Sequence, residues 1–147
     1  MRRRNRAGFT IVELMIVIVA MTILAGILVP QVEQSLQDAN SSAMLTNLYE
    51  LTNAIERYKM DHNGRAPDVV NATLPQLVQS TDIDGNIGQG SGYPYGPYIL
   101  GKIPQNPMNG SARVKEILVA PPTNAQNEIG WLYYPLTGQV WAGEKKQ

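Results

Sequence analysis

The sequence contains no cysteine, which excludes disulfide bonds and thiolate metal sites. It contains one histidine, His62, which leaves little material for a zinc site or for acid–base catalysis by imidazole. It also has no glycine-rich phosphate loop, no plausible nucleophile–base pair and no metal-ligand cluster. These absences argue against an enzyme and leave structural or binding roles.

Basic residues are missing from a long part of the chain. Four of the twelve Lys and Arg residues precede residue 7, and the next basic residue is Arg57. Without the first eight residues, eight basic side chains remain against twelve acidic ones. The body of the protein is therefore mildly acidic and gives no sign of a nucleic-acid-binding surface.

An apolar run extends from Phe9 to Val29, and Glu13 is its one strongly polar side chain. As a helix the run would be about 31 Å long, which is enough to cross the hydrocarbon core of a bilayer. The basic residues precede the run, and positive-inside reasoning then places the N-terminus in the cytoplasm and the C-terminal body outside. The run predicts a single-pass membrane segment.

Three interpretations of the run are open at this point. A secretory signal would be followed by a small-residue cleavage site, and residues 30–32, PQV, offer none. A plain membrane anchor explains the apolar residues but gives no reason for Glu13. A cut before the run, between Gly8 and Phe9, would leave the whole helix on the mature protein.

The residues around that position form a specific combination. Residues 6–14 read RAGFTIVEL, with a basic start before them and a proline closing the run. This pattern resembles the prepilin-type leader of type IV pilins and type II secretion pseudopilins. The resemblance implies that a membrane peptidase cuts after Gly8 and N-methylates the new terminus, Phe9. It also makes Glu13 the fifth residue of the mature chain, a position that the family reserves for glutamate.

Glu13 needs a partner, because a charged side chain in a membrane helix costs roughly 2.5–3.5 kcal/mol on insertion scales. Cleavage after Gly8 would free an α-amine, which is largely protonated at neutral pH. An amine on a neighbouring copy would offset much of this cost and set the axial register between helices. A pair formed within one chain is the alternative.

Pro30 ends the apolar run. Its ring clashes with the carbonyl of Gly26 and it has no N–H to donate, so we expect a helix kink or local melting between these residues, with a simple stop as the alternative. The apolar periodicity resumes beyond it and predicts one helix from about Phe9 to His62, with an amphipathic second half. His62 suits a capping role at the helix end.

The rest of the chain predicts a small sheet that covers the amphipathic half of the helix. Residues 130–143, GWLYYPLTGQVWAG, read as a β-hairpin in which Trp131 and Trp141 pack on the helix or line the sheet. The other expected elements are a short helix at Leu74–Gln79, a loop at Thr81–Gly96, a brief strand at Tyr98–Leu100 and a strand at Arg113–Val119. The predicted fold class is α+β and pilin-like: a long N-terminal helix packed against a small antiparallel β-sheet.

These expectations divide the chain into three parts. Residues 1–8 are a cleaved leader peptide, and residues 9–30 are the transmembrane and assembly half of the helix. Residues 31–147 are a periplasmic globular domain that includes the amphipathic half-helix.

A metal site is a weaker prediction. Asp82, Asp84 and Asn86 stand at alternate positions, a spacing at which oxygen ligands can bind calcium, but the sequence favours a solvated turn over a calcium site here. The family resemblance implies a calcium site in a loop near the C-terminal end. Because that region holds few acids, no ligands are assigned there, and no other cofactor is expected.

The resemblance implies a structural subunit of a pseudopilus, the fibre of a type II protein secretion system. Copies would wait in the inner membrane, surrounded by lipid, and then pack helix to helix. The implied partners are other copies, minor pseudopilins, the prepilin peptidase, and an inner-membrane assembly platform with its ATPase. Two alternatives stay open: a type IV pilin for adhesion, motility or DNA uptake, and a membrane-anchored binding module that never polymerises.

Overall fold

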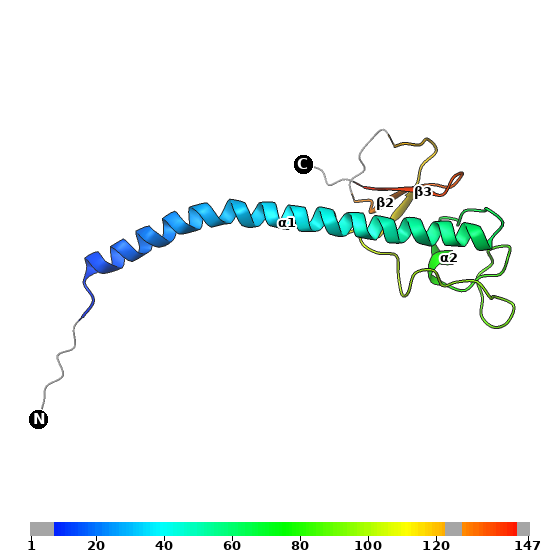
Figure 1. Cartoon of the computed structure of the whole chain (residues 1–147), viewed down its shortest axis with the longest axis horizontal. Coiled ribbons are helices and arrows are strands. Elements are labelled where there is room, and N and C mark those ends of the chain that lie inside the picture. Colours follow the sequence, from blue (N-terminus) through cyan, green and yellow to red (C-terminus); the bar gives the residue numbers. More distant parts are fainter. Residues whose placement is uncertain (1–7, 123–127, 144–147) are drawn as a thin grey trace, which may run out of the picture. The chain divides into compact units, whose positions relative to one another are not determined.

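The computed structural model describes residues 8–122 and 128–143, with no side-chain description at position 30. The chain divides into two units, one ending at Ala39 and the other beginning at Asn40. The elements, in chain order, are α1 (Ile11–Asp61), α2 (Pro75–Val78), β1 (Val114–Glu116), β2 (Trp131–Tyr134) and β3 (Gln139–Ala142) (Figure 1). The predicted α+β architecture with one long N-terminal helix is confirmed.

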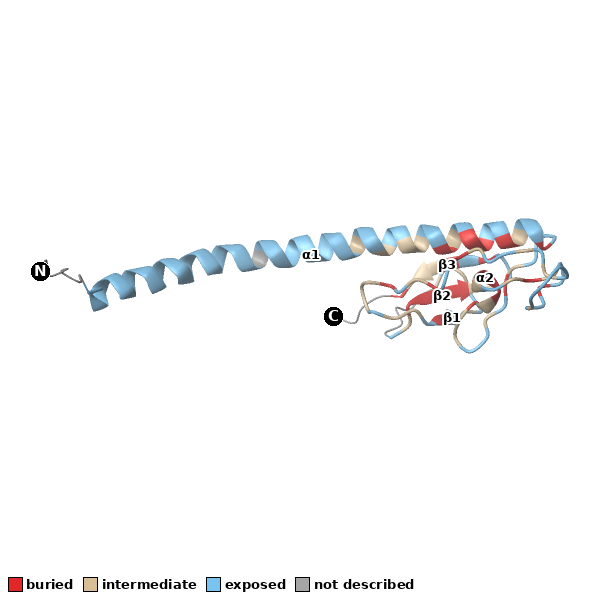
Figure 2. Cartoon of the chain, turned by 90° about the horizontal axis from the view of Figure 1, so that it is seen from below, coloured by how far each residue is buried: buried red, intermediate tan, exposed pale blue. Residues whose placement is uncertain are grey.

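The first unit contains the apolar part of α1 and the more polar helical residues that follow it up to Ala39. Its large hydrophobic side chains are exposed along the whole segment (Figure 2). The helix is long and apolar enough to cross a membrane. α1 continues without interruption through residues 26–30, so the alternative of a helix stop at Pro30 was wrong. The kink between Gly26 and Pro30 stays a prediction.

The second unit buries one face of the remaining part of α1. Leu51, Ile55 and Tyr58 repeat at steps of four and three and are at most 2% exposed. Their partners in the core come from α2, the loops and the strands: Leu74, Leu77, Ile99, Ile103, Val114, Trp131, Tyr133 and Val140. Each such side chain contributes about 1.5–3 kcal/mol when fully buried. The amphipathic half of α1 thus forms one side of the hydrophobic core.

The sheet has three strands in the order β1–β2–β3. β2 and β3 form the predicted antiparallel hairpin, with Trp131 opposite Ala142 and Tyr134 opposite Gln139. β1 pairs with β2 in parallel, so the prediction of an all-antiparallel sheet was wrong. Residues 117–130 connect the two strands, and a connection of a dozen or more residues can return the chain in the same direction.

The hairpin turn rests on α1. Gly138 has a φ of 78°, and a Cβ there would lie 2.9 Å from a methyl carbon of Ile55. The Lys59 ammonium donates a hydrogen bond of 2.9 Å to the carbonyl of Thr137. Glycine is therefore required at this position for two reasons, the left-handed backbone and the close approach of the helix.

The predicted strand at Tyr98–Leu100 was also wrong. The backbone N–H groups of Tyr98 and Ile99 both donate to the carbonyl of Leu77, at 2.8 Å, so this segment caps the end of α2 and bends there.

The loop at Thr81–Gly96 is confirmed, with turns and isolated bridges only. Trp131 is buried and its indole N–H donates to the carbonyl of Pro104, whereas Trp141 is half-buried.

Candidate functional site

Glu13 lies in the first turn of α1 and is bonded within its own chain. One carboxylate oxygen, Oε2, accepts hydrogen bonds from the backbone N–H and the hydroxyl of Thr10, each at 2.8 Å. The N–H of Glu13 in turn donates to the Thr10 hydroxyl at 3.2 Å. This reciprocal pair is a capping box, which satisfies donors that the start of a helix would otherwise leave free.

Thr10 was not among the predicted partners of Glu13, although the Thr-x-x-Glu spacing is the known signature of a capping box. The second carboxylate oxygen, Oε1, has no hydrogen-bond partner within residues 8–122 and 128–143. The Glu13 side chain is also exposed. The acid is therefore partly satisfied in one chain and still presents a free acceptor outward.

Gly8 and Phe9 precede α1 in a non-helical, exposed stretch. A Cβ added at Gly8 would meet nothing within 4 Å, and Phe9 is 84% exposed. The peptide bond predicted to be cut is thus open to an enzyme. The rest of the predicted leader, residues 1–7, lies outside the described residues.

The apolar surface of α1 is large and uncovered in the single chain. Residues 11–29 include side chains that are 42–76% exposed, among them Ile11, Val17 and Met21. Soluble monomers rarely expose contiguous apolar patches of this extent, so the segment requires lipid or other helices around it. This surface and Glu13 share one helix, so a partner that covers the helix also meets the acid.

The calcium candidates form a closed turn. The Asp82 carboxylate accepts the N–H groups of Asp84 and Asn86 at 2.9 Å and the side-chain amide of Asn86 at 2.8 Å. Asp84 lies 3.8 Å from the guanidinium of Arg65, and both side chains are exposed. No group of three or more potential metal-ligating His, Cys, Asp or Glu residues occurs within the part of the chain that the structure describes. Calcium binding stays a prediction, because the turn accounts for these contacts by itself.

The hydrogen bonds to Asp82, above all from the Asn86 side chain, hold the pKa of its carboxyl below the usual value. A carboxyl with a depressed folded-state pKa stabilises the fold above its unfolded pKa of about 3.9 and loses that contribution as the pH falls through the folded value. We expect Asp82→Ala to lower the melting temperature at pH 6, and the difference from the unaltered protein to shrink below pH 4. Circular dichroism melts across pH 6 to 2.5 measure this. A constant difference down to pH 2.5 would contradict the assignment.

His62 is buried at the end of α1, where it makes a structural contact. Its Nδ1 lies 2.8 Å from the carbonyl of Tyr58, and its Nε2 lies 3.0 Å from the Thr81 hydroxyl and 2.8 Å from the carbonyl of Asp82. The ring stacks on Tyr58 with centroids 3.8 Å apart. His62 thus joins the helix end to the loop at residues 81–82, which matches the predicted capping role and offers no catalytic geometry.

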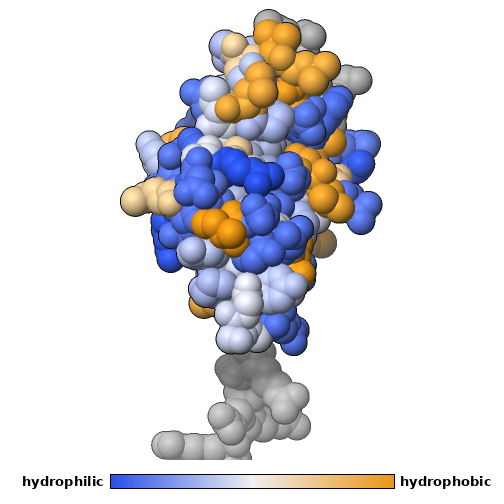
Figure 3. All heavy atoms as spheres, turned by 90° about the vertical axis from the view of Figure 1, so that its right-hand side faces the viewer, coloured by the Kyte–Doolittle hydropathy of each residue, from blue (hydrophilic) through white to orange (hydrophobic). Residues whose placement is uncertain are grey.

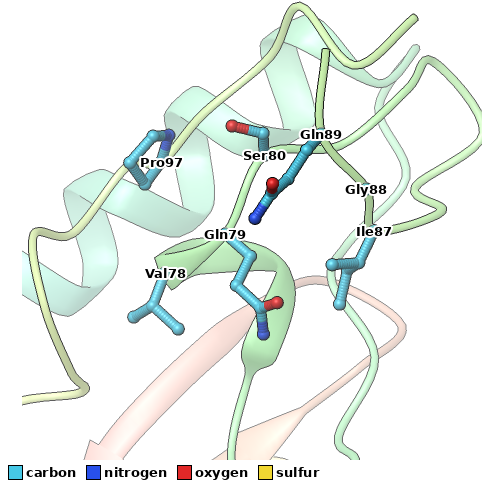
Figure 4. A pocket seen from close by; sticks show the side chains of 7 residues that line it. All are labelled: Val78, Gln79, Ser80, Ile87, Gly88, Gln89 and Pro97. Carbon is cyan, nitrogen blue, oxygen red and sulfur yellow. The ribbon is translucent and has the colours of Figure 1, made fainter.

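A shallow pocket of about 360 Å³ lies between the end of α2 and the following loop. Figure 4 shows its lining, which comes from residues 78–80, residues 87–89 and Pro97. These side chains include no acid, base or histidine, so the pocket offers no reactive group beyond the Ser80 hydroxyl. The face of the globular unit in Figure 3 is mainly hydrophilic, with separate hydrophobic groups. The apolar part of α1 with Glu13 is therefore the stronger functional candidate.

Comparison with known proteins also points to the N-terminal part of α1 as the functional segment. Residues 3–29 match the family model for the prokaryotic N-terminal methylation motif. Type II secretion system core protein G of Klebsiella michiganensis is 32% identical over 88% of this chain and 84% of its own length. Core protein G of Klebsiella pneumoniae is 29% identical over 86% of this chain and 83% of its own length. Core protein G of Escherichia coli is 32% identical over 65% of this chain and 72% of its own length.

No solved structure matches the fold significantly. The sequence similarity nevertheless runs from the methylation motif through most of the globular unit, and it joins the two parts of the chain in one known protein. The chain therefore belongs to the family of type II secretion system core protein G, the major pseudopilins.

Proposed function

We propose that the chain is a structural subunit of a pseudopilus, the fibre of a type II protein secretion system. One observation carries this function: a single helix of 51 residues is exposed and apolar at its start and is built into a folded core at its end. The first part then serves for membrane insertion and assembly. The second part carries the globular unit, and neither part acts as a catalyst.

The helix can exchange one apolar environment for another. In the inner membrane, lipid surrounds the exposed side chains of residues 11–29, and in the fibre the helices of other copies surround them. Apolar surface is out of water in both states, so the step between them does not have to expose it. Helix packing, polar contacts and register then decide the stability of the fibre.

Processing would complete the assembly site. A cut between Gly8 and Phe9 replaces a peptide bond by a protonated amine, which methylation leaves positively charged. The free Oε1 of Glu13 on one copy is then available to the ammonium of Phe9 on a neighbour, while Oε2 keeps its bonds to Thr10. A charged pair of this kind fixes how far one helix is displaced along the next.

The location and partners follow from this role. The first unit anchors the protein in the inner membrane, with the N-terminus in the cytoplasm and the globular domain in the periplasm. The assembled state requires other copies and minor pseudopilins. The steps before it require the prepilin peptidase and an assembly platform with its ATPase. A type IV pilus is the second candidate, and the consistent similarity to core protein G favours the pseudopilus over it.

Deletion tests the proposed function. In a strain whose secretion system contains this chain, deletion of its gene should reduce export of the secreted proteins at least tenfold. The full chain supplied on a plasmid should restore export. The assay is the fraction of a secreted protein in the medium compared with the periplasm. Normal export without the chain would contradict the role of a main structural subunit.

A further inference from the structure

The C-terminal part of the globular unit is held by the side chains of one turn, residues 106–111. Asn106 is fully buried, and its amide nitrogen donates to the carbonyls of Gly130 at 3.1 Å and Gly143 at 2.7 Å. Its amide oxygen accepts the N–H of Met108 at 2.9 Å. A buried asparagine with both donors and its acceptor in use fixes three backbone segments at once.

Two more side chains of the turn act in the same way. The Asn109 amide donates to the carbonyl of Ile129 at 2.8 Å and accepts the N–H of Ser111 at 3.0 Å. The Ser111 hydroxyl donates to the carbonyl of Glu128 at 2.9 Å. Four carbonyls, those of residues 128, 129, 130 and 143, therefore receive hydrogen bonds from three side chains of one turn. We call residues 106, 109 and 111 the amide latch.

The backbone around the latch leaves little space. A Cβ at Gly130 would collide with the carbonyl of Ser111, and the N–H of Gly130 donates to the carbonyl of Arg113 at 3.0 Å. The turn itself is closed by the N–H of Asn106, which donates to the carbonyl of Ser111 at 2.8 Å. The segment that enters β2 is thus clamped directly against the turn.

The latch directs side-chain donors at backbone carbonyls, which are among the oxygen ligands that calcium uses. Calcium takes backbone carbonyls together with carboxylates as ligands, and the family resemblance implies a calcium site in this region. Here each of the four carbonyls already faces a side-chain N–H or O–H donor, which would crowd a cation beside it, and Glu128 is the only carboxylate among the described residues 128–143. The described residues around the latch therefore do not fit a calcium ion.

We propose that the amide latch takes the place of a cation, so that the folding of the C-terminal hairpin does not depend on calcium. The proposal rests on the assignment to the pseudopilins, because it concerns how this chain differs from what that family implies. The proposal is tested on purified protein, whereas the pseudopilus function is tested by protein export from cells. Either test can therefore fail without the other.

The first experiment measures the melting temperature of the full chain in detergent, with 1 mM CaCl₂ or with EGTA. We expect the two values to agree within about 1 °C. Asn106→Asp keeps the shape but turns a carboxylate toward two carbonyls, so we expect a fall of about 5–10 °C in both solutions. The matched control is Asn53→Asp, an exposed site on α1, which should leave the value within about 1 °C.

A fall of 5 °C or more for the unaltered protein in EGTA would overturn the proposal, and so would an Asn106→Asp melting temperature equal to that of the unaltered protein. If Asn106→Asp does not fold, Ser111→Ala removes one donor and gives the milder variant. It should melt a few degrees lower in both solutions. Stabilisation of this variant by calcium, or an unchanged melting temperature, would equally overturn the proposal.

A second readout uses chemistry at two Asn-Gly pairs. In such a pair the glycine nitrogen attacks the side-chain carbon of asparagine, ammonia leaves, and water opens the resulting cyclic imide to aspartate or isoaspartate. The Asn63 side chain is exposed and has no hydrogen-bond partner among the described residues, whereas the latch holds Asn109 at both ends. Peptide mapping after incubation at pH 8 should show deamidation several-fold faster at Asn63. Equal rates would mean that the latch is not formed in solution.

Discussion

Replacing Glu13 by Gln is expected to abolish or cripple fibre assembly while leaving membrane insertion intact. Glutamine has nearly the same shape and can still accept the hydrogen bonds from Thr10, so the start of α1 should remain formed. It carries no charge, however, and cannot pair with the ammonium of a neighbouring copy. Membrane insertion of the variant should be as efficient as that of the unaltered protein or better, because an ionised acid costs roughly 2.5–3.5 kcal/mol in a membrane helix.

The measurement compares the yield of sheared filaments with the amount of protein in the membrane fraction. We expect filament yield to fall at least tenfold for Glu13→Gln and Glu13→Leu at an unchanged membrane level. Glu33→Gln, which removes an exposed acid from the same helix, is the matched control and should keep normal yield. A normal filament yield from Glu13→Gln would contradict the proposal that a charged pair with Glu13 sets the register between helices.

Replacing Gly8 by Val is expected to block processing and, with it, assembly. An added side chain at Gly8 meets no neighbouring atom within 4 Å, so the change should act on the peptidase and not on the fold. Without the cut, the amine stays at the far end of the leader and cannot reach Glu13 of another copy. The assay is mass spectrometry of the N-terminal peptide, which should begin at methylated Phe9 in the unaltered protein and at the leader in the variant.

Gly26→Ala serves as the control for this substitution. It also adds a side chain to a glycine with open space around it, but within the helix and away from the cut. We expect normal processing for this variant. A Gly8→Val chain that still begins at methylated Phe9, or an unaltered chain that keeps its leader, would refute the assigned cleavage site.

The elements that depend on local sequence could be predicted from the sequence. The apolar run and the three-and-four spacing after it predicted α1 to within two residues at its start and one at its end. The hairpin at residues 131–142 follows from two aromatic runs around a short turn. The Thr10–Glu13 capping box was equally readable, because its two residues stand three apart.

Features that depend on contacts far apart in the chain could not be predicted. The parallel pairing of β1 and β2 depends on the connection at residues 117–130, which is too long for a hairpin turn to fix the strand direction from sequence. Tyr98 and Ile99 read as a strand by composition, but they bond to the end of α2 instead. Asn106 looks like any turn asparagine, and only the fold brings the carbonyls of Gly130 and Gly143 to its amide.

An image of the assembled filament at side-chain resolution tests the central claim most directly. The measurement is the distance from the Glu13 carboxylate to the nearest ammonium of an adjoining subunit. We predict that the methylated amine of Phe9 lies within about 4 Å of the free carboxylate oxygen, as in an ordinary ion pair. A Glu13 carboxylate that faces lipid or solvent in the filament, with no cation from a neighbour beside it, would contradict the account.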